Sequence, residues 1–217
     1  RIELERRADG VAVLWIDNQS GCKGLCERVP HAMAANAPAG SVHAPGLCQG
    51  DECLDEALLT GLDQRLAALP AERRARGVVL VMHMMGSHGP AYAKRSPPQQ
   101  KPFSPECTSS ALQDCQHDGL VNAYDNSIVY TDRVLAQAIG VLAQGLETPA
   151  ITVIGHSVGG LIARKALVQE RLDAIREARR TSVSDSGPPV TATTTRSRAS
   201  HVAVILLSAR YFASAAS

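Results

Sequence analysis

The sequence is poor in aromatic side chains and nearly neutral in charge. Its 217 residues include two Phe, four Tyr and one Trp, too few to build a platform on which nucleic-acid bases would stack. The formal net charge of +1 at pH 7 also argues against capture of nucleic acid by bulk electrostatics. We therefore predict no nucleic-acid partner.

Long apolar runs are absent as well. No run approaches the roughly 18 apolar residues that read as a membrane span, and the run Val202–Leu207 is far too short. The opening residues RIELERR lack the apolar core of a signal peptide. We expect no membrane span here, and we expect the chain to be an internal piece of a longer protein or a processed product.

Short apolar runs alternating with helical patterns predict a layered α/β fold. Residues 11–16 and 77–82 are apolar runs that end at polar or Gly-rich loops, as strands do. Residues 55–69 place leucines at helical spacing before Pro70, which predicts one helix. Residues 118–142 predict a long amphipathic helix, and residues 30–50 predict a loop excursion.

Two histidines follow the second predicted strand. His83 and His88 lie in the sequence HMMGSHGPAY, where the apolar run gives way to Gly and Pro. In open α/β sheets, ligands bind outside the carboxyl ends of the strands. An imidazole there can ligate a metal, hold a phosphate oxygen or donate a proton. The alternative is one surface histidine and one core histidine without a chemical role.

The six cysteines fall into three close pairs. Each pair lies in polar loop sequence: Cys22 with Cys26, Cys48 with Cys53, and Cys107 with Cys115. Their spacings lack the two CxxC knuckles of a zinc ribbon. Local disulfides are favoured because each partner lies within nine residues, with free buried thiols as the alternative. Disulfides would indicate an oxidising compartment such as the periplasm.

Three motifs together resemble the lipid A phosphoethanolamine transferases. They are DNQSGCKGLCERVP from Asp17, HMMGSHGPAY from His83 with Lys94 and Arg95 after it, and LVNAYDNSIVYTD from Leu120. The resemblance covers residues 10–142 and implies an alkaline phosphatase/sulfatase-like catalytic domain, periplasmic and belonging to an inner-membrane enzyme. It implies zinc-dependent transfer of phosphoethanolamine from phosphatidylethanolamine to lipid A through a phosphorylated threonine, and with it polymyxin resistance.

The resemblance also implies roles for particular residues. His88 would contact the transferred phosphate or a second zinc, and the three cysteine pairs would be disulfides. Asn18, Gln19 and Lys23 would grip a phosphate or a lipid headgroup. Alternatively, Asn18 caps a turn and Lys23 is a solvated surface charge. Asn126 and its neighbour Asp125 are predicted to be structural, since they share a packed helical face with tyrosines.

The last third of the sequence departs from this family. After Gly145 a family member would reach a Ser-Asp-His-Gly-Glu segment that ligates zinc, but no Asp-His pair occurs in the sequence. The threonine nucleophile and a metal-binding glutamate would lie upstream of Arg1. We therefore predict a partial catalytic domain over 1–145, inactive as it stands, and a divergent segment over 146–217 arising from a fusion or a reading-frame change.

A different enzyme class is suggested within that segment. The sequence GHSVGG from Gly155 resembles the nucleophile elbow of α/β-hydrolase esterases and lipases, with Ser157 as nucleophile. His201 is the candidate base and Asp185 the candidate acid, but residues 177–200 are predicted to be disordered. A third reading is a secreted, disulfide-stapled domain without catalytic activity.

Overall fold

The computed structural model describes residues 10–22, 24–145, 150–155 and 201–207. The strands are β1 (Ala12–Asp17), β2 (His31–Met33), β3 (Cys48–Gln49), β4 (Glu52–Cys53), β5 (Gly77–His83), β6 (Ala150–Gly155) and β7 (His201–Leu207). The α-helices are α2 (Leu62–Ala67), α3 (Ala71–Arg74) and α4 (His117–Gly145), and short 3-10 helices are η1 (Asp55–Leu59), η2 (Tyr92–Arg95), η3 (Pro98–Gln100) and η4 (Leu112–Asp114).

Five of these strands form one parallel sheet, in the order β2-β1-β5-β7-β6. Because the strands are parallel, their carboxyl ends meet at the same edge. The predicted strands at 11–16 and 77–82 are confirmed as β1 and β5, which are direct neighbours. Their nearly continuous apolar sequence is typical of parallel strands buried on both faces.

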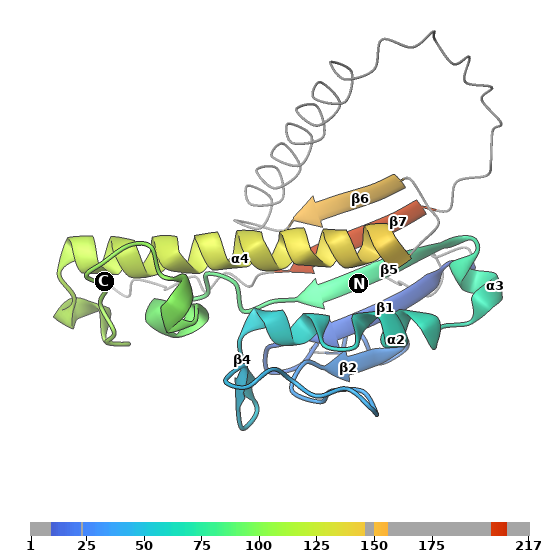
Figure 1. Ribbon diagram of the computed structural model, residues 1–217, viewed down its shortest axis with the longest axis horizontal. Helices are drawn as coiled ribbons and strands as arrows, with labels where there is room; N and C mark the ends of the chain where they lie inside the picture. The colour runs from blue at the N-terminus through green and yellow to red at the C-terminus, as the bar shows by residue number, and fades with distance from the viewer. Residues whose placement is uncertain (1–9, 23, 146–149, 156–200, 208–217) are drawn as a thin grey trace, which may run out of the picture.

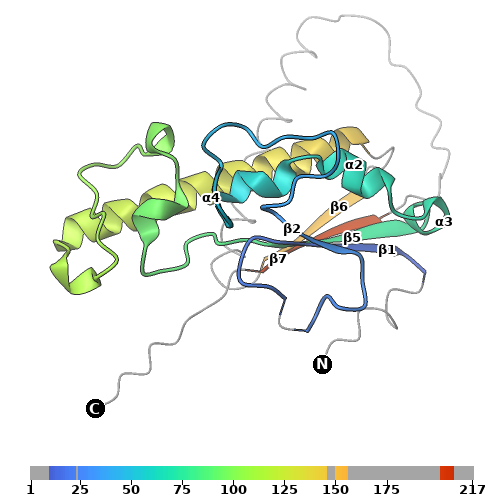
Figure 2. The same ribbon diagram turned by 90° about the horizontal axis from the view of Figure 1, so that it is seen from below.

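The two faces of the sheet bury different residues, because side chains alternate along a strand. Leu14 and Ile16 of β1 join the main hydrophobic cluster with Leu62 of α2 and Leu135 of α4. Trp15 belongs to a smaller cluster on the opposite face, formed with Val13, Val29, Val81 and Cys26. Helices α2 and α4 accordingly lie on the same side of the sheet (Figure 2).

Helix α4 is longer than the sheet that it covers and runs past its edge (Figure 1). Beyond the sheet it anchors the loop that precedes it. The fully buried Asn126 accepts a hydrogen bond from the Phe103 backbone N–H at 3.0 Å and donates to the Phe103 carbonyl at 2.9 Å. Its amide also donates to Glu106 at 3.1 Å. The predicted long helix and the structural role of Asn126 are both confirmed.

The single helix predicted over residues 55–69 is wrong, because the chain breaks there into η1 and α2. Gly61 separates the two with φ +61°, a left-handed conformation that L side chains rarely adopt. A Cβ at this position would lie 2.3 Å from Pro38. The helical spacing of the apolar residues therefore continues through Gly61, although the backbone does not continue as a helix there.

The loop predicted over residues 30–50 also contains a strand that the sequence did not indicate. Strand β2 pairs with β1 at the edge of the sheet, with Trp15 opposite His31 and Asp17 opposite Met33. Residues 48–53 form the antiparallel β3–β4 hairpin, in which Cys48 and Cys53 are opposite each other and disulfide-bonded.

Strands β6 and β7 extend the sheet on the far side of β5. Both strands lie in residues 146–217, which the sequence predicts to be a divergent segment. This division of the chain stays a prediction. Among the helices of the described ranges, none combines the length and the apolar character of a membrane span.

Candidate functional site

Asp17 and His83 end the two adjacent strands β1 and β5 and pair side by side. Nδ1 of His83 lies 2.8 Å from Oδ2 of Asp17. Both side chains are largely shielded, with 13% exposed for His83 and 3% for Asp17. The Trp15 ring meets the His83 ring edge to face, at a centroid distance of 5.7 Å. The prediction that His83 ends the strand is confirmed.

Asp17 is held ionised by the donors around it. Burial alone would raise its pKa, but hydrogen bonds from His83, the Gln19 backbone and Trp15 together hold the pKa below its ordinary value. Because an ionised carboxylate only accepts hydrogen bonds, the proton shared with Asp17 belongs to Nδ1 of His83. The Nε2 atom of His83 is then the atom that accepts or releases a proton, or contacts an anion.

A second carboxylate, Asp55, shapes the loop between the two histidines. Asp55 is 3% exposed, and its side chain accepts hydrogen bonds from the backbone N–H groups of Met85 at 2.8 Å and Gly86 at 2.6 Å. The Asn18 amide donates a third at 2.7 Å. Burial raises the pKa of Asp55, although these donors and the charge of Arg95 act in the opposite direction.

His88 lies in the turn that Asp55 holds. Its side chain is half-buried, and its Nδ1 lies 2.8 Å from the Gly89 carbonyl oxygen. Arg95, at the end of η2, donates from Nε to the His88 carbonyl at 3.0 Å. The backbone of His88 is therefore fixed from two sides, by Asp55 through the loop and by Arg95 directly.

The structure gives Asn18 and Gln19 internal partners. Asn18 donates its amide to the Cys53 carbonyl at 3.0 Å and to Asp55, so both amide N–H groups have acceptors within the protein. Gln19 donates to the Met84 carbonyl at 2.6 Å. Their predicted contact with a phosphate stays a prediction, and for Asn18 it requires an exchange of partners. Asn18 is also buried. Lys23 lies outside the described residues.

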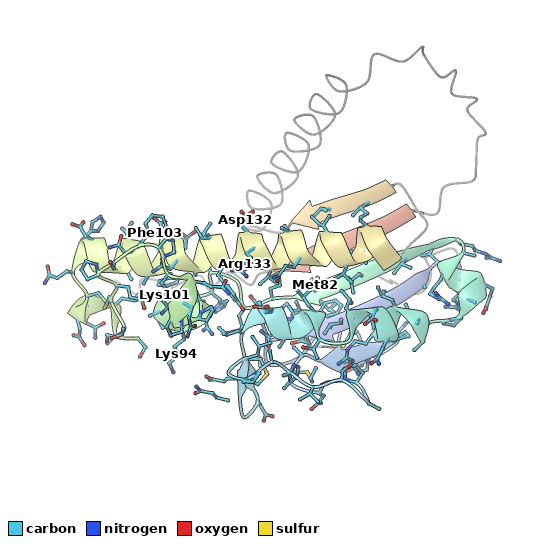
Figure 3. The ribbon with its side chains drawn as sticks, viewed as in Figure 1. Met82, Lys94, Lys101, Phe103, Asp132 and Arg133 are labelled. Carbon is cyan, nitrogen blue, oxygen red and sulfur yellow. A yellow bond between two sulfur atoms is a disulfide. The ribbon has the colours of Figure 1, made fainter. Side chains whose placement is uncertain are left out.

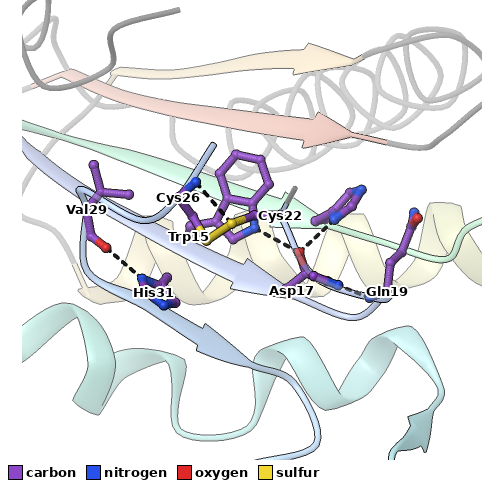
Figure 4. The surroundings of a disulfide bond; sticks show 9 residues. Trp15, Asp17, Gln19, Cys22, Cys26, Val29 and His31 are labelled. Atoms are coloured by element: carbon purple, nitrogen blue, oxygen red, sulfur yellow. Dashed lines mark hydrogen bonds and ion pairs between the residues drawn. A yellow bond between two sulfur atoms is a disulfide. The ribbon is translucent and has the colours of Figure 1, made fainter. Parts of the chain in front are cut away.

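The three predicted disulfides are confirmed. Their Cα–Cα distances are 5.7 Å for Cys22–Cys26, 4.0 Å for Cys48–Cys53 and 5.6 Å for Cys107–Cys115. The first packs beside Trp15, which in turn donates from Nε1 to Asp17 at 3.1 Å (Figure 4). The second closes the hairpin whose Cys53 carbonyl binds Asn18. Two disulfides therefore support the residues around the site.

The described residues do not form a metal site. Within the described ranges, no three His, Cys, Asp or Glu side chains gather closely enough to hold a metal ion. All six cysteine sulfurs are in disulfides, and His83 is paired with Asp17. Zinc sites in proteins use three or four such ligands, so this part of the chain does not fit the implied zinc. A zinc role for His88 stays a prediction.

The alternative hydrolase site consists of Ser157, Asp185 and His201. Ser157 and Asp185 lie outside the described residues, and of His201 only the backbone is described, at the start of β7. Strand β6 ends at Gly155, two residues before Ser157.

No site role was predicted from the sequence for Asp17 or Asp55, and Arg95 was noted only as part of a motif. Asp55 was assigned to a helix, and its partners lie some 30 residues away along the chain. Asp17 carried a usable signal, because it ends an apolar strand as His83 does. Two strand-terminal polar residues on neighbouring parallel strands are expected to meet.

Comparison with known proteins places this arrangement in a family. The model of the Sulfatase family matches residues 6–154, which is more than half of the chain. The chain belongs to the sulfatase family. The match includes β1, β5, α4 and most of β6, and thus both strands that carry Asp17 and His83.

The sulfatase-family relatives include several phosphoethanolamine transferases. The chain is 40% identical over 141 residues to phosphoethanolamine transferase EptA of Salmonella typhimurium, covering 65% of this chain and 24% of that protein. It is 38% identical over 133 residues to phosphatidylethanolamine transferase Mcr-1 of Escherichia coli, covering 60% and 24%. The matched part thus spans about a quarter of the length of these relatives.

Solved structures agree with the sulfatase-like α/β fold. The integral membrane lipooligosaccharide phosphoethanolamine transferase A of Neisseria meningitidis matches with a TM-score of 0.55 and 35% identity, over 65% of this chain and 24% of that chain. The soluble domain of the same enzyme matches with a TM-score of 0.53 and 35% identity, over 64% and 38%.

Proposed function

We propose that this chain is part of the periplasmic catalytic domain of an inner-membrane phosphoethanolamine transferase, with phosphatidylethanolamine as donor and lipid A as acceptor. The observation that carries the proposal is the 40% identity to EptA over 141 residues. Transfer of phosphoethanolamine places an ammonium group next to a lipid A phosphate. It therefore lowers the net negative charge that attracts cationic polymyxins, which is the proposed route to resistance.

In this proposal the chain supplies groups that hold a phosphoryl group. His83, oriented by Asp17, presents Nε2 to exchange a proton or to contact a phosphate oxygen. His88, whose backbone is fixed by Arg95, is the second imidazole. Such preorganised donors stabilise charge that develops on a transferring phosphoryl group.

We further propose that the 217-residue chain does not catalyse the transfer by itself, and that it divides near residue 145 into a family segment and a divergent segment. The sequence contains no Asp-His pair, which the family resemblance implies as zinc ligands. When catalytic residues act as one unit, the enzyme loses nearly all activity if a central member is missing.

A segment exchange tests the role of the family part. Residues 10–142 would replace the matching segment of Escherichia coli EptA, and lipid A from cells carrying the chimera would be examined by mass spectrometry. We expect added phosphoethanolamine and raised polymyxin tolerance, both lost in the chimera with His88→Ala. A chimera that accumulates and keeps its disulfides but leaves lipid A unmodified would refute the proposed role.

The isolated chain provides the second test. We expect no transfer from labelled phosphatidylethanolamine, with or without added zinc, while intact Escherichia coli EptA transfers the label under the same conditions. Zinc-stimulated transfer by the purified chain would show that it carries a complete active site.

A second candidate function is ester hydrolysis by Ser157. The observation in its favour is that β6 ends at Gly155, as a strand does before a nucleophile elbow. A phosphonate probe would then label the chain, and Ser157→Ala would abolish both labelling and slow ester cleavage. Absence of labelling would remove this candidate.

A further inference from the structure

The side chain of His88 is held by the backbone of the residue that follows it. Its Nδ1 atom lies 2.8 Å from the carbonyl oxygen of Gly89. Because a carbonyl oxygen only accepts hydrogen bonds, the proton in this contact belongs to Nδ1. The neutral ring of His88 then carries its lone pair on Nε2, the same tautomer that Asp17 imposes on His83. The orientation and the tautomer of His88 therefore depend on the position of the Gly89 carbonyl.

The ring of Tyr92 contacts Gly89 and also helix α4. A Cβ atom added at Gly89 would lie 2.7 Å from Oη of Tyr92 and 2.8 Å from its Cζ, closer than Cβ atoms approach other atoms in proteins. Glycine at this position thus permits a contact that a larger residue would prevent. On α4, the ring of Tyr124 meets the Tyr92 ring edge to face, with 5.4 Å between the centroids. Tyr92 therefore connects α4 to the peptide unit that holds His88.

The 3-10 helix η2 has a second connection to α4. Lys101 donates to the Ala93 carbonyl of η2 at 2.7 Å and forms an ion pair with Glu106. Glu106 in turn accepts a hydrogen bond from Asn126 of α4 at 3.1 Å. Figure 3 shows Lys101 near α4, whereas Lys94 of η2 projects away from that helix. The ring contact and these hydrogen bonds together fix η2 against α4.

We propose that Tyr92 and Tyr124 are positioning residues for His88. Tyr124 holds the ring of Tyr92, and that ring fixes the Gly89 peptide. The Gly89 carbonyl then orients the imidazole with Nε2 as its basic atom, while Arg95 of η2 holds the carbonyl of His88 itself. This inference rests on the proposed function, in which His88 is the second imidazole at the phosphoryl group. Proton exchange there requires a basic nitrogen at a defined position.

NMR of the histidine rings in the full 217-residue chain tests the proposal. Long-range ¹H–¹⁵N spectra distinguish the Nδ1–H from the Nε2–H tautomer and are recorded at about pH 8.5, where imidazoles are neutral. The signals of His88 are those that disappear in His88→Gln. We expect the Nδ1–H tautomer to predominate in both His83 and His88. A native His88 that is mainly in the Nε2–H tautomer would overturn the proposal.

Two variants change the two sides of the contact between Tyr92 and Gly89. Tyr92→Leu removes the ring, and Gly89→Ala adds a methyl group that cannot fit beside it. Each should shift the tautomer ratio of His88 about 3- to 10-fold toward Nε2–H, the effect of weakening one hydrogen bond. The ratio of His83 in the same spectrum should not change. Tyr124→Leu should shift the ratio of His88 in the same direction.

Tyr92→Phe and Lys94→Gln are the matched controls. Tyr92→Phe keeps the ring and should keep the native tautomer of His88. Lys94→Gln changes an exposed residue of the same 3-10 helix and should also leave the ratio unchanged. Unchanged ratios of His88 in both Tyr92→Leu and Gly89→Ala would overturn the proposal, as would equal shifts at His83. The His83 signals also show whether each variant is folded, and if one variant is not, the other decides.

The EptA chimera separates this inference from the proposed function. In an active chimera, Tyr92→Leu should lower kcat about 10- to 100-fold, because a misplaced group loses its alignment with the reacting atoms. The KM for the donor should change little. The expected tautomers together with an inactive chimera would support the positioning of His88 and remove only the transferase role. An active chimera whose kcat is the same with Tyr92→Leu would overturn the role of this tyrosine in the reaction.

Discussion

Asp17 accepts a hydrogen bond from His83 across two neighbouring parallel strands, at 2.8 Å between Oδ2 and Nδ1. The same carboxylate accepts hydrogen bonds from Trp15 Nε1 at 3.1 Å and from the Gln19 backbone at 2.7 Å. One buried carboxylate thus fixes the orientation of the imidazole and the first turn of the following loop. The arrangement of the candidate site at this edge of the sheet and the stability of the fold therefore depend on the same side chain.

Asp17→Asn should destabilise the fold by about 1–3 kcal/mol. The NH₂ group of the asparagine would face hydrogen-bond donors and would leave at least one of them without an acceptor. Urea unfolding followed by circular dichroism measures the change. Asp63→Asn on the exposed face of α2 is the control and should shift the free energy of unfolding by less than about 0.5 kcal/mol. Equal losses in the two variants would contradict a special role for Asp17.

The stability of the protein should also depend on pH through Asp17. Its pKa in the folded state lies below the ordinary value of 3.8, so its contribution is present above the pKa of the unfolded chain. That contribution is lost as the pH falls through the folded pKa. Below pH 4, we expect the free energy of unfolding to fall more steeply with pH in the native chain than in Asp17→Asn. The difference between the two slopes should be on the order of the slope for one bound proton. Parallel pH curves would contradict this assignment.

Asp55 should control the order of the histidine loop. Asp55→Ala removes the acceptor of the Met85 and Gly86 N–H groups, so the exchange of these two amides with deuterium should become about 10- to 100-fold faster, the equivalent of 1.4–2.8 kcal/mol. Asp51→Asn, at an exposed position in the turn of the neighbouring β3–β4 hairpin, is the control. Retained protection of both amides in Asp55→Ala would show that the loop is held by other contacts.

The sequence predicts elements that depend on local pattern and misses those that depend on distant partners. Strands β1 and β5 and helix α4 carry their own apolar periodicity, so they are recognisable without the fold. Strand β2 has three residues, and only its pairing with β1 makes it a strand. The break at Gly61 is set by its conformation and by Pro38, some 20 residues away, which periodicity does not report.

The same distinction applies to the site. His83 and His88 were predicted because they follow an apolar strand directly. The function of Asp55 arises from contacts with Asn18 and with Met85 and Gly86, which become neighbours only after folding. The disulfides were predictable because each pair closes a short loop.

Those disulfides yield a direct chemical prediction. Protein purified without reductant should take up no alkyl groups from iodoacetamide, and reduced, unfolded protein should take up six, one for each cysteine, as intact mass will show. The double variant Cys107→Ser with Cys115→Ser should lose about 2–4 kcal/mol of stability, since the bridge constrains the unfolded chain. Alkylation of the unreduced native protein would contradict the pairing.

Asn126 and Asn122 both bind the loop before α4, but only Asn126 is fully buried. Asn126→Ala leaves the Phe103 N–H and carbonyl without their partner and removes a hydrogen bond to Glu106, so we expect a loss of about 2–4 kcal/mol. Asn122 lies one turn earlier in α4 and donates one hydrogen bond to the same loop, to the Pro105 carbonyl at 2.8 Å. Because this group is half-exposed, Asn122→Ala should cost less than about 1 kcal/mol. Urea unfolding of the two variants measures the difference. Losses of equal size would mean that burial does not decide how strongly α4 holds the loop before it.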